Sequence, residues 1–212
     1  MSATSIDFLT AALGRRSLLC LALLAAVAAS AALGGRAVAS DEATSQVERF
    51  EASLLRLSQN GVAPFAQRFA QIAPAVDATF DLQTILQAST APNWDTMSSD
   101  QQARLLQVFR KYTIASFVAN FNKPRDRFQI TGERDVGADK IVGSTIGDTR
   151  LGFVVRHTAS GWRTVDVLAD GTISLVATQR SDFRSTLMHG GAPALTATLQ
   201  RKVSDLSGGS LA

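Results

Sequence analysis

Asp166 and Arg180 are the two residues whose types and positions most suggest chemistry. Asp166 lies inside the alternating stretch 161–169, where an aspartate is unfavourable for a strand, and Arg180 follows in the next predicted element. As an enzyme pair, Asp166 would be a general base whose pKa is raised by burial, and Arg180 would bind an oxyanion or the substrate. As a structural pair, they would form a salt bridge that holds the C-terminal helix to the sheet, and loss of either partner would cost ~3–5 kcal/mol. Because no third group has a clear role beside them, the sequence favours the structural pair.

The other reactive residues form no recognised catalytic or metal-binding pattern. The two histidines, His157 and His189, lack the spacing of metal ligands, and the sequence contains no nucleotide-binding or serine-hydrolase motif. The basic segment 122–128 is typical of a solvated loop, although it could instead contact anionic head groups or a partner protein. We therefore expect no metal, no cofactor and no enzymatic activity.

Residues 1–39 have the features of a cleaved secretory signal. An arginine pair at 15–16 precedes an apolar run of about 16 residues, which is shorter than the ~20 that span a membrane. Ala37 and Ala39 form an A-x-A site, so we expect cleavage before Ser40 and export by the general or the twin-arginine route.

Removal of this signal changes the charge and the thiol chemistry of the chain. The signal contains the only cysteine, Cys20, so the mature chain can form no disulfide. It also contains three arginines and one aspartate, so its loss lowers the net charge from +3 to about +1. Such a balance argues against nucleic acid as a partner.

The first part of the mature chain is predicted to be helical. Helical spacing of apolar residues occurs in three regions: about 41–60, a stretch from 63 to 90 that Pro64 and Pro74 break into short helices, and about 98–121. Asp81 is well placed to cap the short helix that contains Ile85 and Leu86, and Ser98 or Ser99 is expected to begin the longest helix.

Strands and two further helices follow. Residues 127–137, 140–146, 150–158 and 161–170 alternate with period two, and their short links predict an antiparallel meander. In the last strand Val165 and Val167 are expected on the covered face, with Thr164 and Asp166 on the other. Helices at about 174–189 and 193–206 precede a flexible tail at 207–212. We therefore predict one α+β domain at 40–206, in which a twisted antiparallel sheet of about four strands is covered by N-terminal and C-terminal helices around an apolar cavity.

The stretch 161–202 contains an ordered set of residues that is typical of one protein family: Trp162, Asp166, Gly171, Ser174, Leu175, Arg180, Phe183, Gly190 and Leu195. By this set it resembles the MlaC family of periplasmic lipid-transport proteins, also known as toluene-tolerance auxiliary proteins. Upstream, Phe80 and Asp81 resemble the "FD" segment of that family, and Trp94 and the long helix with Phe109 follow it. The sequence is also similar to the HpnM branch of the family, which is known in hopanoid-making Gram-negative bacteria. The chain departs from the family at Ala169–Asp170, where a larger residue and a glutamate are common.

This resemblance implies a periplasmic carrier that holds the acyl chains of a phospholipid or hopanoid-type lipid and shuttles it between the two membranes. Its implied partners are an inner-membrane ABC-type lipid transporter with its substrate-binding component and an outer-membrane lipoprotein complex. Asp166 and Arg180 would then form a structural frame of the pocket. The apolar residues expected to line the pocket are Ile85, Leu86, Phe109, Tyr112, Phe128, Ile130, Phe153, Val155, Val165, Val167 and Val176.

Two other classes of protein remain possible from the residues alone. A small periplasmic enzyme of nuclear-transport-factor-like fold could use Asp166 as its general base. A periplasmic chaperone or adaptor could bind peptides in an apolar groove. Each would have a similar architecture.

Overall fold

The computed structural model of the protein describes residues 42–211. The predicted signal 1–39 and its cleavage site lie outside the described residues, so they stay predictions. Along the chain the elements are α2 (Glu42–Gln59), α3 (Phe65–Thr79), α4 (Leu82–Thr90), the 3-10 helix η1 (Asn93–Thr96), α5 (Ser99–Asn120), β1 (Phe128–Val136), β2 (Asp139–Ile146), β3 (Thr149–Thr158), β4 (Gly161–Ala169), β5 (Ile173–Ser174) and α6 (Leu175–Ser207).

Polar caps start the middle helices where the sequence predicts them. The Asp81 carboxylate accepts a hydrogen bond from the backbone N–H of Thr84 at 2.9 Å and so begins α4. Ser98 and Gln101 form a capping box at the start of α5. The prediction that Pro74 ends a helix is wrong, because α3 continues through it. Ile72 and Val76, on either side of that proline, are almost completely buried, and this burial offsets the backbone hydrogen bond that a proline cannot donate.

The sheet is an antiparallel meander in the order β1-β2-β3-β4-β5, as the short turns predict. The two-residue strand β5 was not expected. The strands β3 and β4 change register between Val154 and Val155, so that Asp166 faces Val154 and Thr164 faces Val155. The predicted orientation of Thr164 is therefore wrong: it shares the helix-covered face with Val155 and is 0% exposed.

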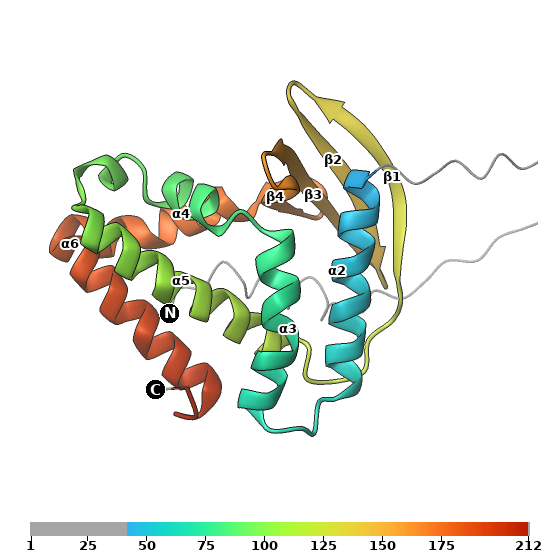
Figure 1. The fold of residues 1–212 in the computed structure, drawn as a ribbon, viewed down its shortest axis with the longest axis horizontal. Coiled ribbons are helices and arrows are strands. Elements are labelled where there is room, and N and C mark those ends of the chain that lie inside the picture. Colours follow the sequence, from blue (N-terminus) through green and yellow to red (C-terminus); the bar gives the residue numbers. More distant parts are fainter. Residues whose placement is uncertain (1–41, 212) are drawn as a thin grey trace, which may run out of the picture.

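The helices form two groups around this sheet (Figure 1). The first group is α2 and α3, and α2 packs on β1, β2 and β4. The second group is α4, α5 and α6, which pack on one another beside it. A bidentate ion pair between Arg110 of α5 and Asp77 of α3 joins the groups. The architecture is thus the predicted α+β arrangement.

Two arms make up α6 (Figure 1). Gly191 has φ 61° and ψ −159°, a conformation that breaks the helix and that glycine adopts without a side-chain clash. The sequence therefore predicted correctly that two helices close the chain. The flexibility of the tail stays a prediction; residues 208–211 form hydrogen-bonded turns, and Leu211 packs against the core.

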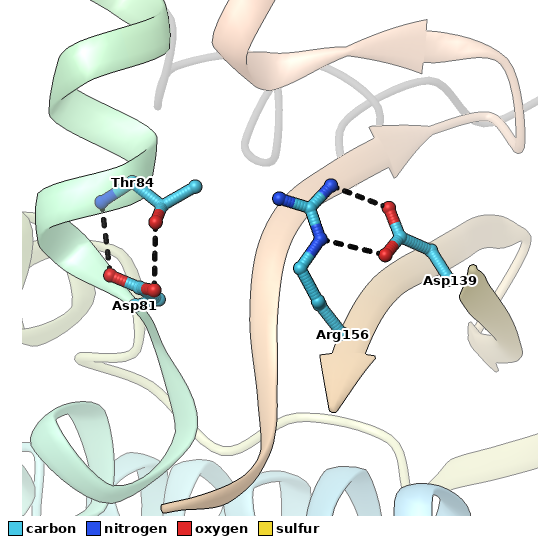
Figure 2. A network of polar contacts seen from close by, with 4 residues as sticks. All are labelled: Asp81, Thr84, Asp139 and Arg156. Carbon is cyan, nitrogen blue, oxygen red and sulfur yellow. Dashed lines mark hydrogen bonds and ion pairs between the residues drawn. The ribbon is translucent and has the colours of Figure 1, made fainter. Parts of the chain in front are cut away.

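Two polar contacts, one within the sheet and one at the start of α4, lie near each other (Figure 2). Asp139 and Arg156 face each other across β2 and β3 and form two hydrogen bonds of 2.7 Å. The hydrogen bonds from Arg156 hold the pKa of Asp139 below its usual value. Asp81 caps α4 beside this pair (Figure 2). The backbone N–H of Asp81 donates to the carbonyl oxygen of Thr164 in β4 at 3.0 Å. The N-terminus of α4 is thereby attached to the sheet.

Candidate functional site

An apolar cavity of about 50 Å³ lies between the sheet and helices from both groups. Seven of the eleven phenylalanines in the chain line it, so its wall is more aromatic than the core as a whole. The lining residues are Phe50, Leu54, Phe80, Leu82, Ile85, Phe109, Thr113, Phe117, Phe121, Phe128, Ile146, Leu151, Phe153, Asp166, Val167, Leu175, Val176 and Gln179. We call this site the phenylalanine-lined cavity.

Phe50 of α2 is at the centre of the aromatic wall. Its ring meets Phe80 edge to face at 5.0 Å and Phe117 at 5.2 Å between centroids, and Phe153 of β3 lies at 6.4 Å. These contacts join α2, the α3–α4 junction, α5 and the sheet. Because aromatic rings pack in several offset geometries of similar energy, such a wall can rearrange around an apolar guest.

The cavity has three polar residues, and they differ in how their polar atoms are satisfied. The Oε1 atom of Gln179 accepts a hydrogen bond from Ser89 Oγ at 3.0 Å. Asp166 is held by neighbouring donors. The Thr113 hydroxyl, on a side chain that is largely buried, has no hydrogen-bond partner within residues 42–211. An unpaired hydroxyl in an apolar wall could bind a single acceptor, such as an ester carbonyl.

Asp166 does not pair with Arg180, which corrects the predicted structural frame. Its Oδ1 accepts from the backbone N–H of Val167 at 2.7 Å and of Val176 at 3.0 Å, and its Oδ2 accepts from Ser174 Oγ at 2.5 Å. Arg180 is exposed and points to a cleft outside the cavity. The reason is geometric: the first N–H groups of α6 are unpaired within the helix and lie nearer to Asp166 than a side chain one turn further on.

Six of the eleven predicted lining residues do line the cavity: Ile85, Phe109, Phe128, Phe153, Val167 and Val176. Leu86, Tyr112, Val155 and Val165 are buried elsewhere in the protein, and Ile130 is only partly buried. In the helices, Leu86 and Tyr112 each lie one position away from a lining residue. A step of one position turns the side chain by about 100° around the helix axis. In the sheet the register change at Val154 and Val155 ends the regular alternation.

Sequence reasoning missed several lining residues that carry a recognisable signal. Thr113, Phe117 and Phe121 follow the predicted Phe109 at intervals of four residues, and together they form one stripe along α5 and its C-cap that faces the cavity. Counting this stripe would have selected them over Tyr112. Phe50 and Leu54, also four apart, form the equivalent stripe on α2.

Glu51 is a second unusual group, next to the cavity residue Phe50 but directed toward the sheet. Glu51 is only 4% exposed, and its burial raises the pKa of its carboxyl group from 4.5 to about 7. Ser144 of β2 lies beside it and opposes the rise, and Glu48 adds to it. Among the described residues neither Glu51 Oε1 nor Ser144 Oγ reaches a partner at hydrogen-bonding geometry, so desolvation dominates.

Residues 42–211 contain no group of three or more potential metal ligands. None of their helices is long and apolar enough to cross a membrane.

Comparison with known proteins places this site in context. A family model described as "MlaC protein" matches residues 48–201. Among solved structures, the fold is similar to that of the phospholipid-binding protein from Ralstonia solanacearum, which was determined in complex with a phospholipid. The two are 18% identical, with a TM-score of 0.69, over 79% of this chain and 99% of that chain. No curated protein matches the sequence.

Proposed function

This chain belongs to the MlaC protein family, and we propose that it is a periplasmic carrier that holds the acyl chains of a phospholipid in the phenylalanine-lined cavity. The observation that carries this proposal is the cavity wall, of which all but three of the residues are apolar. The likeness in fold to a phospholipid-binding protein supports it. The domain would comprise residues 40–206, after removal of the signal.

The energetics of acyl chains explain why such a carrier needs an apolar wall and few polar groups. A phospholipid with about 30 methylenes gains roughly 24 kcal/mol when these leave water, at ~0.8 kcal/mol each, before ordering costs. Binding therefore needs no strong polar contact in the wall. Release is the harder step, so membrane partners must open the protein or compete for its cargo.

The partners follow from the same proposal. We expect an inner-membrane ABC-type lipid transporter, through its substrate-binding component, at one end of the route, and an outer-membrane lipoprotein complex at the other. A hopanoid-type lipid would suit the same wall, because it is also large and apolar.

The environment of Asp166 favours a carrier over an enzyme that uses this residue as general base. Three donors already occupy its carboxylate oxygens, and two of them, the Val176 N–H and the Ser174 hydroxyl, belong to the start of α6. To abstract a proton, the carboxylate would first have to give up contacts that hold the helix in place. Its position is better explained as a helix cap.

Lipid extraction tests the proposal directly. The protein purified from its native host is extracted with organic solvent, and the extract is analysed by mass spectrometry. We expect lipid in about equimolar amount. A protein that carries no lipid and takes none from vesicles would contradict the carrier function.

Variants of the wall locate the lipid. Val167→Glu places a charge in the cavity and Val176→Trp fills it without a charge, so both should remove the co-purifying lipid. Gln129→Glu, on an exposed position of β1, is the matched control and should keep it. Circular dichroism identifies the variants that still fold. Full lipid in a folded wall variant would mean that the lipid binds elsewhere.

A further inference from the structure

A second cavity lies outside the phenylalanine-lined cavity, between the end of α4, η1 and the first arm of α6. It measures about 580 Å³, and its walls include Ser89 and Asn93 on one side and Arg180, Ser181 and Arg184 on the other. We call it the arginine cleft. Unlike the inner cavity, it mixes polar and apolar groups, and the apolar ones include Met188, which is 69% exposed.

The arginine cleft has an uncompensated positive charge. Arg180 and Arg184 are one helical turn apart on α6, so their guanidinium groups are neighbours on the same face. Both are exposed, and neither forms a hydrogen bond or an ion pair with the described part of the chain. No carboxylate lines the cleft. Two like charges at this spacing repel each other, and a bound anion would relieve that repulsion.

The chemistry of these groups selects the anion. Guanidinium presents a planar set of N–H donors that matches the oxygens of a phosphate, and two such groups can bind one phosphate from different directions. Asn93 and Ser181 add uncharged donors at the same site. A tetrahedral phosphate group therefore fits the cleft better than an isolated carboxylate or a neutral ligand.

The arginine cleft and the phenylalanine-lined cavity have a boundary in common at Ser89 and Gln179. Gln179 lines the inner cavity and Ser89 lines the cleft, and their side chains are joined by the 3.0 Å hydrogen bond. The same two helices face both spaces: Val176 and Gln179 of α6 face the cavity, whereas Arg180 faces the cleft. A movement of α4 away from α6 that breaks this hydrogen bond would connect the two spaces.

We propose that the arginine cleft binds the phosphate of a phospholipid whose acyl chains enter the phenylalanine-lined cavity past Ser89 and Gln179. This inference rests on the proposed carrier function and adds the position of the head group and the path of entry. Arg180 and Arg184 bind the phosphate, and the apolar side chain of Met188 covers the adjoining part of the lipid. The protein should therefore discriminate between lipids: one with a phosphate group should load better than one that has the same acyl chains but no phosphate group.

A competition assay tests this preference. Labelled phosphatidylcholine or labelled diacylglycerol with identical acyl chains is added in trace amount to the same phosphatidylcholine vesicles, so that attraction to the vesicle surface is equal. The vesicles are then removed, and label per protein is counted. The wild-type protein should take up the phosphate-bearing lipid roughly tenfold better, as expected for charge-assisted hydrogen bonds. Arg180→Gln/Arg184→Gln should lower this ratio to nearly one.

The matched control removes two exposed positive charges elsewhere. Lys123→Gln/Arg127→Gln, in the linker between α5 and β1, changes the net charge by the same amount and should keep the preference. Equal uptake of both lipids by the wild type, or an unchanged ratio in the arginine variant, would overturn the head-group site while the carrier function stands. If the wild type loads neither lipid, the carrier function itself fails.

A second arm separates a lipid head group from a free phosphate ligand. Inorganic phosphate is titrated into vesicle-free protein, and the side-chain N–H signals of the arginines are followed by NMR. We expect weak binding that is lost in Arg180→Gln/Arg184→Gln and that competes with lipid loading. Tight phosphate binding without any lipid preference in the vesicle assay would assign the cleft to a soluble phosphate compound and overturn the inference.

Discussion

The Asp166 carboxylate connects β4 to the start of α6. It accepts hydrogen bonds from Val167 N, Val176 N and Ser174 Oγ, and Ser174 is itself the N-cap residue, whose hydroxyl accepts from Ala177 N at 3.0 Å. A strand aspartate, disfavoured by propensity, is thus explained by a helix that needs a cap.

We therefore expect Asp166→Ala to lower the free energy of unfolding by about 2–3 kcal/mol, because hydrogen bonds to a charged group are lost. Arg180→Ala should be nearly neutral, and the two changes should be additive. Asp166→Ala and Ser174→Ala should instead be coupled, since these side chains share a hydrogen bond. Urea unfolding measures all of these. Strong coupling between Asp166 and Arg180 would contradict the pairing seen in the structure.

The helix α2 packs an ionisable group against the sheet as well as apolar ones. Val47, Phe50 and Leu54 form the buried apolar stripe of the helix. Glu51 follows Phe50, and its neighbour in the sheet is Ser144 of β2. Burial holds the pKa of Glu51 at about 7, above its ordinary value of 4.5. The packing of α2 is therefore sensitive to pH in a range where most carboxylates are not.

This raised pKa predicts the direction of a pH effect on stability. Between pH 4.5 and about 7 the folded state keeps the Glu51 proton and the unfolded state releases it, so the free energy of unfolding falls as pH rises. The total fall should be about 3 kcal/mol, and it should level off above pH 7. Glu51→Gln should remove most of this dependence on pH and should be more stable than the wild type at pH 8. Urea unfolding at several pH values measures the free energy of unfolding of both proteins.

The control for this prediction is Glu48→Gln, which changes an exposed carboxylate on the same helix. It should keep most of the slope, because the Glu48 charge is a lesser cause of the raised pKa than burial is. If Glu51→Gln and the wild type show the same pH profile, Glu51 is charged in the folded state.

The molecule as a whole must change shape to hold a lipid. The phenylalanine-lined cavity measures about 50 Å³, whereas pockets for drug-sized ligands measure about 300–1,000 Å³. Protein interiors are close-packed and compress little, so the extra volume must come from helices that move relative to the sheet. The contact between α4 and α6, held by the Ser89–Gln179 hydrogen bond, is the place where we expect this movement.

Hydrogen exchange should show where the protein opens. When lipid is loaded from vesicles, the backbone N–H groups of α4 and of residues 175–183 in α6 should change their exchange rates. Those of the β2–β3 ladder should not, because the sheet pairing does not depend on the cavity. The Val167→Glu variant, treated with the same vesicles, is the control and should show no change. An even change over the whole chain would instead indicate global stabilisation without a local opening.

Local patterns in the sequence determined most of the elements of this protein. Apolar spacing placed α2 and α5, the caps at Asp81 and Ser98 placed the starts of helices, and alternation with short turns determined the meander. These features depend on neighbours within a few residues, so the sequence alone contains them. The α5 stripe that faces the cavity is of the same kind and could have been found.

Tertiary structure decided what depends on distant contacts. The register change between β3 and β4 buried Thr164, which alternation alone had placed outside. The proximity of β4 to the start of α6 gave Asp166 the Val176 N–H and the Ser174 hydroxyl as donors in place of Arg180 and left Arg180 free to face the cleft. Burial on both sides let α3 continue through Pro74. The volume of the cavity likewise depends on how closely side chains from several elements pack together, so no pattern within one element can predict it.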